Sequence, residues 1–430
     1  MNNTFTWRVS RLLYFARRIK GSIAHRGVRG AFQRLLQQSG GLRSMLGATT
    51  ATQINVRAPV RDGAAMRRIL VVDSMVPDPI RDSGSMRLMQ MMELLHEQGW
   101  RIDFIAADGF ATAADIVRLA NIGVCYQAGN PLRWLRQQGS KLDAVLLCRL
   151  PVASQYLGFI RQSSPHAKVV FDTVDLHYVR EQRAAALTGN KRLYRHAEQS
   201  RRRELDAISR SDVTLVVSQE ERLTLVRELP SIRVELLSNI HAIHGRRMDF
   251  DARRDLLFIG GFGHPPNADA MQWFAQEILP LLRASEPSLV LHVVGDIDEA
   301  SRRALARDGL VIHGRVDNIE PLMQRCRVSV APLRFGAGVK GKVNLAMSYG
   351  LPVVVTSIAA EGMFLADESN ALVADDPKGF ASAILRLYRD RDLWIRLSDG
   401  ALENVRHHFS VEQARRTLLR VFSPDMPDGA

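Results

Sequence analysis

The sequence is organised by short apolar runs that alternate with longer amphipathic stretches. RILVVD (68–73) is followed by Leu88, Met91, Met92 and Leu95 at helical spacing. Further runs of the same kind are RIDFIAAD (101–108), DAVLLC (143–148), KVVFDT (168–173), DVTLVVS (212–218) and VELLSN (234–239). Strands that are separated by helices run parallel and are covered on both faces of their sheet. The alternation therefore predicts an α/β protein.

The alternation stops once and then restarts, which predicts two domains. Residues 240–254 are polar and lack a period, and apolar runs return at 255–260, 289–296, 310–316, 328–333, 352–357 and 370–376. A chain of 430 residues is long enough for two cores. We expect a basic leader (1–66), a first Rossmann-like domain (67–240), a linker (241–254), a second Rossmann-like domain (255–410) and a C-terminal helix (411–430) that can return to the first. Residues from Pro377 to about Arg420 are predicted to form a long helical tail.

The positive charge is concentrated in the leader. The chain carries a net +13, and residues 1–66 hold eleven Lys or Arg against the single acid Asp62. Basic residues around an apolar stripe favour contact of residues 1–45 with an anionic membrane surface, and a disordered tail is the alternative. Because the remaining residues are nearly balanced in charge, we expect no nucleic-acid partner.

The cysteines and the hydropathy indicate a protein located in the cytoplasm, where it can also lie at the inner face of the membrane. Cys125, Cys148 and Cys326 are scattered and form no C-x-x-C pair, which argues against a zinc site and a disulfide framework. No uncharged apolar run reaches the roughly 18–20 residues that span a bilayer.

The glycine-rich segment RFGAGVKGKVNLAMSYGLPVV (334–354) is the strongest candidate for a ligand site. Gly336 and Gly338 allow close approach of a ligand to the backbone, and a helix is predicted to start near Gly341. Lys340 and Lys342 add two cations at that helix start, where free N–H groups favour an anion such as a diphosphate. A plain glycine-rich connection with solvated lysines is the equally weighted alternative.

Two further turns follow predicted strands. FIGGFGHPPNADAMQWF (258–274) places Gly260 and Gly261 at a strand end, with His264 as a phosphate contact or a loop residue, and predicts a helix after Asn267. VDSMVPDPIRDSGSMR (72–87) places Gly84 in a turn that opens a helix, either facing a ligand or simply capped by serine.

The segment FDTVDLHYVREQR (171–183) brings acid and base chemistry to one strand end. Asp172, Asp175 and His177 are followed by Arg180 and Glu181. Such a group suits a base or a substrate clamp, whereas turn residues and helix caps are the alternative.

Taken in this order, these segments resemble the family 4 (group 1) retaining glycosyltransferases of GT-B fold, of the bacterial surface-polysaccharide type. The resemblance covers about residues 68 to 420 and includes VVSQEE and GLPVVVTSIAAEGM. It implies two Rossmann-like domains that face each other across a cleft. It also implies a nucleotide diphosphate sugar as donor, a glycan or lipid-linked acceptor, a hexosyltransferase-like activity in polysaccharide biosynthesis, and neither metal nor cofactor. The catalytic candidates are Asp175, His177 and Lys340.

The sequence departs from this family at several positions. The two glutamates usual in the family fall at Ala337 and Leu345, beside which Asn344 can substitute in part. The usual Arg and Lys after the first strand of the second domain fall at Gly261 and Pro266. The complete set of expected nucleotide-sugar contacts is Gly84, Gly260, Gly261, His264, Arg334, Gly336, Gly338, Lys340, Lys342, Asn344 and Glu361.

These departures keep a second function in view, namely a catalytically inactive GT-B protein that binds glycan or nucleotide. The missing glutamates favour it, whereas the retained lysines and glycines oppose it. A nucleic-acid binder led by the basic segment is a third alternative, with few aromatic residues to support it.

Overall fold

The computed structural model describes residues 66–79, 82–336 and 338–423. The predicted leader, apart from Met66, lies outside the described residues, as does Ala337. The chain divides into two compact units. The first holds the described residues up to Pro77 together with Leu95–Lys168, and the second holds Asp78–Leu94 together with the chain from Val169 onward.

The first unit is built around a parallel sheet in the order β3-β2-β1-β4. Its strands are β1 (Arg68–Asp73), β2 (Arg101–Ala106), β3 (Val124–Tyr126) and β4 (Ala144–Cys148). Its helices are α3 (Ala113–Asn121), α4 (Pro131–Gln138) and α5 (Leu150–Ser163). In the central strand β1, every residue from Ile69 to Asp73 is buried, as is typical of a strand covered on both faces.

The second unit contains the remaining strands of this sheet, whose full order is β3-β2-β1-β4-β5-β6-β7. They are β5 (Lys168–Asp172), β6 (Val213–Val216) and β7 (Val234–Leu236). The helices that accompany them are α2 (Ser83–Glu97), α6 (His177–Thr188), α7 (Lys191–Ser209) and α8 (Gln219–Glu228).

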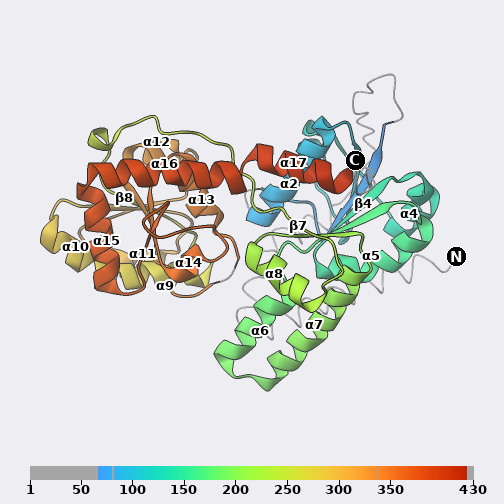
Figure 1. The fold of residues 1–430 in the computed structure, drawn as a ribbon, viewed down its shortest axis with the longest axis horizontal. Coiled ribbons are helices and arrows are strands. Elements are labelled where there is room, and N and C mark those ends of the chain that lie inside the picture. Colours follow the sequence, from blue (N-terminus) through green and yellow to red (C-terminus); the bar gives the residue numbers. More distant parts are fainter. Residues whose placement is uncertain (1–65, 80–81, 337, 424–430) are drawn as a thin grey trace. The chain divides into compact units, whose positions relative to one another are not determined.

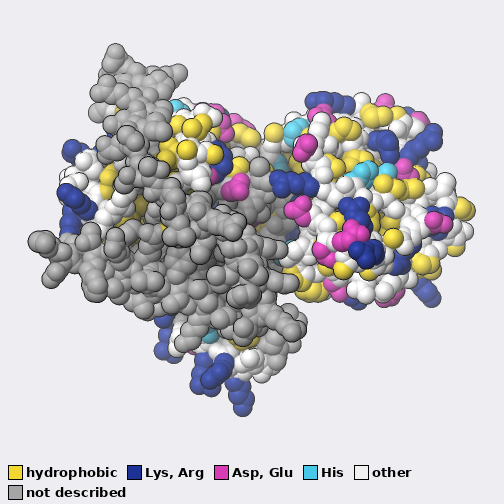
Figure 2. Space-filling view, turned by 180° about the vertical axis from the view of Figure 1, so that it is seen from behind, with side chains coloured by type: hydrophobic (Ala, Val, Ile, Leu, Met, Phe, Trp, Pro, Cys, Tyr) yellow, Lys and Arg dark blue, Asp and Glu magenta, His cyan; other side chains and the backbone are white. Residues whose placement is uncertain are grey.

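Helices α6 and α7 lie side by side as a helical hairpin (Figure 1). Lys191, Arg192 and Arg195 are exposed near the hairpin turn. Figure 2 shows Lys and Arg side chains at the lower end of the molecule, where this hairpin lies. The overall charge balance of residues 67–430 therefore conceals a local basic surface.

The second unit also contains a six-stranded parallel sheet in the order β10-β9-β8-β11-β12-β13. Its strands are β8 (Leu256–Ile259), β9 (Leu291–Val294), β10 (Leu310–Gly314), β11 (Val328–Ala331), β12 (Val353–Val355) and β13 (Leu372–Val373). The associated helices are α9 (Pro265–Trp273), α10 (Leu279–Ser285), α11 (Glu299–Leu305), α12 (Glu320–Arg325), α13 (Gly341–Ser348) and α14 (Ser357–Ala360). The two parallel sheets confirm the predicted α/β architecture.

The C-terminal tail is three helices rather than one long helix. They are α15 (Pro377–Arg389), α16 (Arg391–His408) and α17 (Val411–Phe422). The tail breaks where Asp390 and Ser410 cap the next helix by accepting backbone N–H bonds. Helix α17 contacts β7, and Arg420 near its end lies 2.9 Å from Glu235 of that strand.

Two local predictions were wrong for identifiable reasons. Helix α9 begins at Pro265 rather than after Asn267, because proline suits the first helical positions, where no backbone donor is needed. Helix α2 is capped by Asp82 rather than by a serine, since its carboxylate accepts the backbone N–H of Ser85 at 2.7 Å.

A buried ion pair connects α2 to β5. Arg87 and Asp172 are at most 1% exposed, and Nη1 lies 2.7 Å from Oδ2. Arg87 Nε also donates to the carbonyl oxygens of Leu237 and Ser238, just after β7. One guanidinium therefore holds together a helix start, a strand end and the chain leaving the sheet.

Replacement of Arg87 by Met should strongly destabilise the fold, because it leaves the Asp172 carboxylate buried without its cation. We expect the free energy of unfolding to fall by about 3–5 kcal/mol. Chemical denaturation at pH 7 measures this loss, with the exposed Arg203→Met as control. Adding Asp172→Asn should restore part of the stability, and a variant as stable as the control would contradict the structural role.

Candidate functional site

The carboxyl edge of the six-stranded sheet is shaped by glycines. Gly295, which follows β9, has a φ of +146°, and a Cβ added there would lie 2.2 Å from the carbonyl oxygen of Gly260. A Cβ on Gly260 would lie 2.8 Å from Cγ of Asn267. Asn267 Nδ2 in turn donates to the carbonyl oxygen of Gly261 at 2.9 Å. The turns after β8 and β9 are therefore packed together, with little room for side chains.

The turn between β11 and α13 reaches the same edge. Gly336 and Gly338 have φ values of +142° and +77°, and a Cβ on Gly336 would lie 3.8 Å from Pro266 at the start of α9. Helix α13 begins at Gly341, as predicted, and Lys340 at its N-cap makes no side-chain capping bond. A lysine side chain has no hydrogen-bond acceptor, so Lys340 brings positive charge but no cap to the first backbone donors of α13.

Lys340 and Lys342 give this helix start its charge. Neither lysine has a carboxylate within ion-pair distance among the residues that the structure describes. Burial lowers the pKa of Lys340 to about 8, although the Glu361 charge opposes this, and Nζ lies 3.5 Å from the carbonyl oxygen of Glu361. Desolvation also lowers the pKa of Lys342, but its side chain is exposed, so we give Lys340 more weight. A half-buried ammonium without a counter-ion is stabilised by a bound anion.

The other residues predicted to contact the nucleotide sugar at this edge are paired, exposed or enclosed. The Arg334 guanidinium binds the Asp269 carboxylate at 2.5 Å, and Glu361 accepts from Arg183 at the same distance. His264 is the exposed N-cap residue of α9. Asn344 is fully buried, and neither of its amide atoms has a hydrogen-bond partner within the described part of the chain. The glycine turns therefore pack together and Lys340 lies at the start of α13, whereas Arg334 is paired with Asp269 and Asn344 is enclosed.

Asp175 and His177 lie in the loop between β5 and α6. Asp175 lies 2.5 Å from Arg180, and His177 Nδ1 lies 3.2 Å from the carbonyl oxygen of Asp175. Burial lowers the pKa of His177 below its ordinary value, against an opposing effect of the Asp175 charge, so the imidazole is neutral at pH 7. The N-cap residue of α6 is Leu176, without a side-chain capping bond. The alternative that Asp175 and His177 serve as helix caps is therefore wrong.

The groups that cap α6 were not anticipated from the sequence. Glu204 of α7 accepts the backbone N–H groups of His177 and Tyr178, and Glu221 of α8 accepts that of Leu176. Burial raises the pKa of Glu204 to about 8 and that of Glu221 to about 7. One sequence signal could have identified Glu204: it is a charged residue at helical spacing from Ala197 and Ser200, on the face of α7 that is buried.

Gly84 lies in the first turn of α2, where Asp82 provides the cap.

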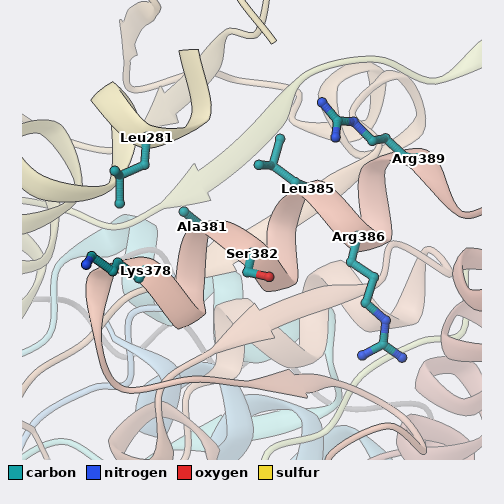
Figure 3. A pocket seen from close by; sticks show the side chains of 7 residues that line it. All are labelled: Leu281, Lys378, Ala381, Ser382, Leu385, Arg386 and Arg389. Carbon is teal, nitrogen blue, oxygen red and sulfur yellow. The ribbon is translucent and has the colours of Figure 1, made fainter. Parts of the chain in front are cut away.

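A shallow pocket of about 430 Å³ lies between α10 and α15, away from these groups (Figure 3). It is lined by Leu281, Lys378, Ala381, Ser382, Leu385, Arg386 and Arg389. Arg386 is paired with Glu368, and Arg389 with Glu286 at 2.8 Å. None of the predicted site residues lines this pocket.

Within residues 66–79, 82–336 and 338–423, no helix has the length and apolar character needed to cross a membrane. No group of three or more His, Cys, Asp or Glu side chains in the same ranges could hold a metal ion.

Part of the chain matches a known protein family. The family model described as "Glycosyl transferases group 1" matches residues 253–390. An uncharacterised 44.6 kDa protein in the cps region of Klebsiella pneumoniae is 26% identical over 229 residues, which is 51% of this chain and 56% of that protein. The chain thus spans little more than half the length of this curated relative.

Solved structures share the fold at low sequence identity. HepE from Anabaena has a TM-score of 0.61 at 12% identity and covers 83% of this chain and 100% of its own. Sucrose-phosphate synthase from Thermosynechococcus elongatus has a TM-score of 0.60 at 16% identity and covers 83% and 98%. These structures show that the fold is GT-B, and residues 253–390 match the group 1 glycosyltransferase model.

Proposed function

We propose that the protein transfers a sugar from a nucleotide diphosphate sugar to a glycan or lipid-linked acceptor, with retention and without a metal. The observation that carries this proposal is the pair Lys340 and Lys342 at the uncapped start of α13, among glycine turns. Negative charge develops on the departing diphosphate in the transition state, and fixed cations and helix donors stabilise it there. Gly260, Gly261, Gly336 and Gly338 let the diphosphate approach the backbone.

The named relatives support the donor and the setting of this proposal. HepE was crystallised with UDP and with UDP-glucose, which favours a uridine nucleotide as the first donor to test. The Klebsiella relative comes from a cps region, which favours polysaccharide biosynthesis, and the glucose of the HepE complex favours a hexosyl group. A cytoplasmic site at the inner face of the membrane, with residues 1–45 on anionic lipid, would suit a lipid-linked acceptor.

His177 and Asp175 are proposed to serve the acceptor. A neutral imidazole can take or relay the proton of the attacking hydroxyl, and its Nε2 has no hydrogen-bond partner among the described residues. Asp175 orients this ring through its carbonyl oxygen and binds Arg180 through its carboxylate.

A second candidate function is a GT-B protein that binds nucleotide or glycan without transfer. The observation that favours it is α13 itself, where Leu345 and the enclosed Asn344 occupy the place of a ribose-binding glutamate. Incubation of the purified protein with a panel of UDP- and GDP-sugars separates the two functions. Nucleotide binding without donor hydrolysis or transfer would select the second.

Lys340→Ala should weaken binding of the nucleotide diphosphate, since a charge-assisted contact worth about 1.5–3 kcal/mol is lost. This corresponds to a Kd increase of about 10- to 150-fold with an unchanged melting temperature. Isothermal titration with UDP measures it, and the exposed Lys378→Ala on α15 is the matched control. Above about pH 8, UDP affinity should also fall in the wild type as Lys340 loses its proton, but not in Lys340→Arg. Wild-type affinity in Lys340→Ala would refute the phosphate assignment.

Dialysis against EDTA should leave the transfer rate unchanged, because lysines and helix donors neutralise the leaving group. The rate is measured with the donor that the panel identifies, before and after addition of Mg²⁺ or Mn²⁺. A rate that disappears and returns with metal would contradict the metal-independent mechanism.

His177→Ala should lower kcat by about 100-fold or more, the usual size for one lost proton-transfer group. UDP affinity should change little, because the proposed phosphate contacts belong to other residues. The exposed His166→Ala is the control. A lower melting temperature with normal kcat would assign His177 to structure alone.

A further inference from the structure

Helix α6 is capped by a side chain from another helix. Its own N-cap residue, Leu176, offers no side-chain acceptor, and Asp175 is engaged with Arg180. Glu204 of α7 supplies both acceptors instead: Oε1 takes the N–H of His177 at 3.2 Å, and Oε2 takes that of Tyr178 at 3.0 Å. The carboxylate thus fixes the backbone of the residue whose imidazole is proposed to move the proton.

The loop before α6 needs such a restraint. Val174 has a φ of +63°, which is unfavourable for a β-branched residue. Its N–H donates to Oδ1 of Asp172 at 3.3 Å, and the N–H of Leu176 donates to Glu221 at 3.1 Å. Strained backbone persists only where its surroundings hold it, and here three acidic side chains accept the backbone N–H groups of four residues, namely Val174, Leu176, His177 and Tyr178.

This backbone determines which nitrogen of His177 carries the proton. Nδ1 lies 3.2 Å from the carbonyl oxygen of Asp175, which can only accept. Nδ1 also lies 3.5 Å from Oδ1 of Asp175 and 3.7 Å from Oε1 of Glu204. In the neutral ring, Nδ1 is therefore the donor, and Nε2 keeps its lone pair for an acceptor hydroxyl.

Glu204 lies among apolar residues, where a carboxyl group is costly to bury. It is fully buried on the face of α7 that also buries Ala197, Ala207 and Ile208. Burial raises the pKa of Glu204 even though two backbone N–H groups favour its ionised form. A buried carboxyl without a cation is costly, and its presence indicates a gain in conformational specificity.

We propose that Glu204 is a positioning residue of the transfer reaction, which holds His177 so that Nδ1 donates to the Asp175 carbonyl and Nε2 is the base. This inference rests on the proposed role of His177. Glu204 itself is buried on α7 and acts only through the backbone N–H groups of His177 and Tyr178.

Glu204→Gln tests this role above pH 8, where the Glu204 carboxyl group is ionised, since an amide keeps its size but replaces one of its two acceptor oxygens by a donor. We expect kcat to fall by between about 10- and 100-fold, a usual cost of misplacing a reacting group by about 1 Å, with the donor KM unchanged. Glu198→Gln, on the exposed face of the same helix, is the matched control and should behave as wild type.

A double-mutant cycle separates positioning from general weakening of the fold. If Glu204 acts through His177, Glu204→Gln should cost nothing further in a His177→Ala background. An equal loss in both backgrounds would overturn the proposal, because the effect would then be independent of the imidazole.

The ring nitrogens give a readout that needs no activity. In ¹⁵N-histidine-labelled protein, assigned with His177→Ala, His177 should show a protonated Nδ1 and an unprotonated Nε2, and Glu204→Gln should mix the two tautomers. A wild-type ring protonated mainly at Nε2 overturns the proposal, even if the variant does not fold. A protein without transferase activity would refute the proposed function, while this spectrum would still decide the role of Glu204.

Discussion

The parallel direction of all strands is the constraint on which this structure depends. Parallel strands end at one edge of their sheet, so each turn into a following helix is delivered there. In the six-stranded sheet, the turns after β8, β9 and β11 meet closely enough that Gly260 and Gly295 have no room for a side chain. The proposed diphosphate contacts lie on the turns after β8 and β11, and the strands beneath them are almost entirely buried.

The loops at the seven-stranded sheet are held differently, by acidic side chains that are buried or half-buried. Asp172 is bound by Arg87, while Glu204 and Glu221 bind backbone N–H groups of the β5–α6 loop. A carboxyl group removed from water costs free energy unless it is hydrogen-bonded, and these three groups are. Such interactions hold one conformation of the loop that contains the strained Val174 and, three residues later, His177.

The sequence predicted what depends on local pattern. The strands followed from β-branched runs, and the start of α13 from glycines and lysines in one turn. The sequence pattern did not predict strand β3, because its three residues are too few to show an alternation of apolar and polar positions. It misplaced the start of α9, where prolines rather than Asn267 set the boundary. It could not pair Arg87 with Asp172 or Glu204 with His177, because these partners are 85 and 27 residues apart and only the fold brings them together.

The surroundings of His177 and of Lys340 differ in how completely their polar groups are paired. Around His177 the described residues satisfy the loop: its backbone donors are bound, Asp175 is paired, and the ring is fixed before any ligand arrives. Around Lys340 the arrangement is incomplete, since its ammonium is half-buried without an ion-pair partner among the described residues and α13 has no side-chain cap. A preorganised base costs little reorganisation during reaction, whereas uncompensated positive charge gives affinity to an anion. This asymmetry fits a protein that binds a diphosphate by charge and receives its acceptor at a prepared imidazole.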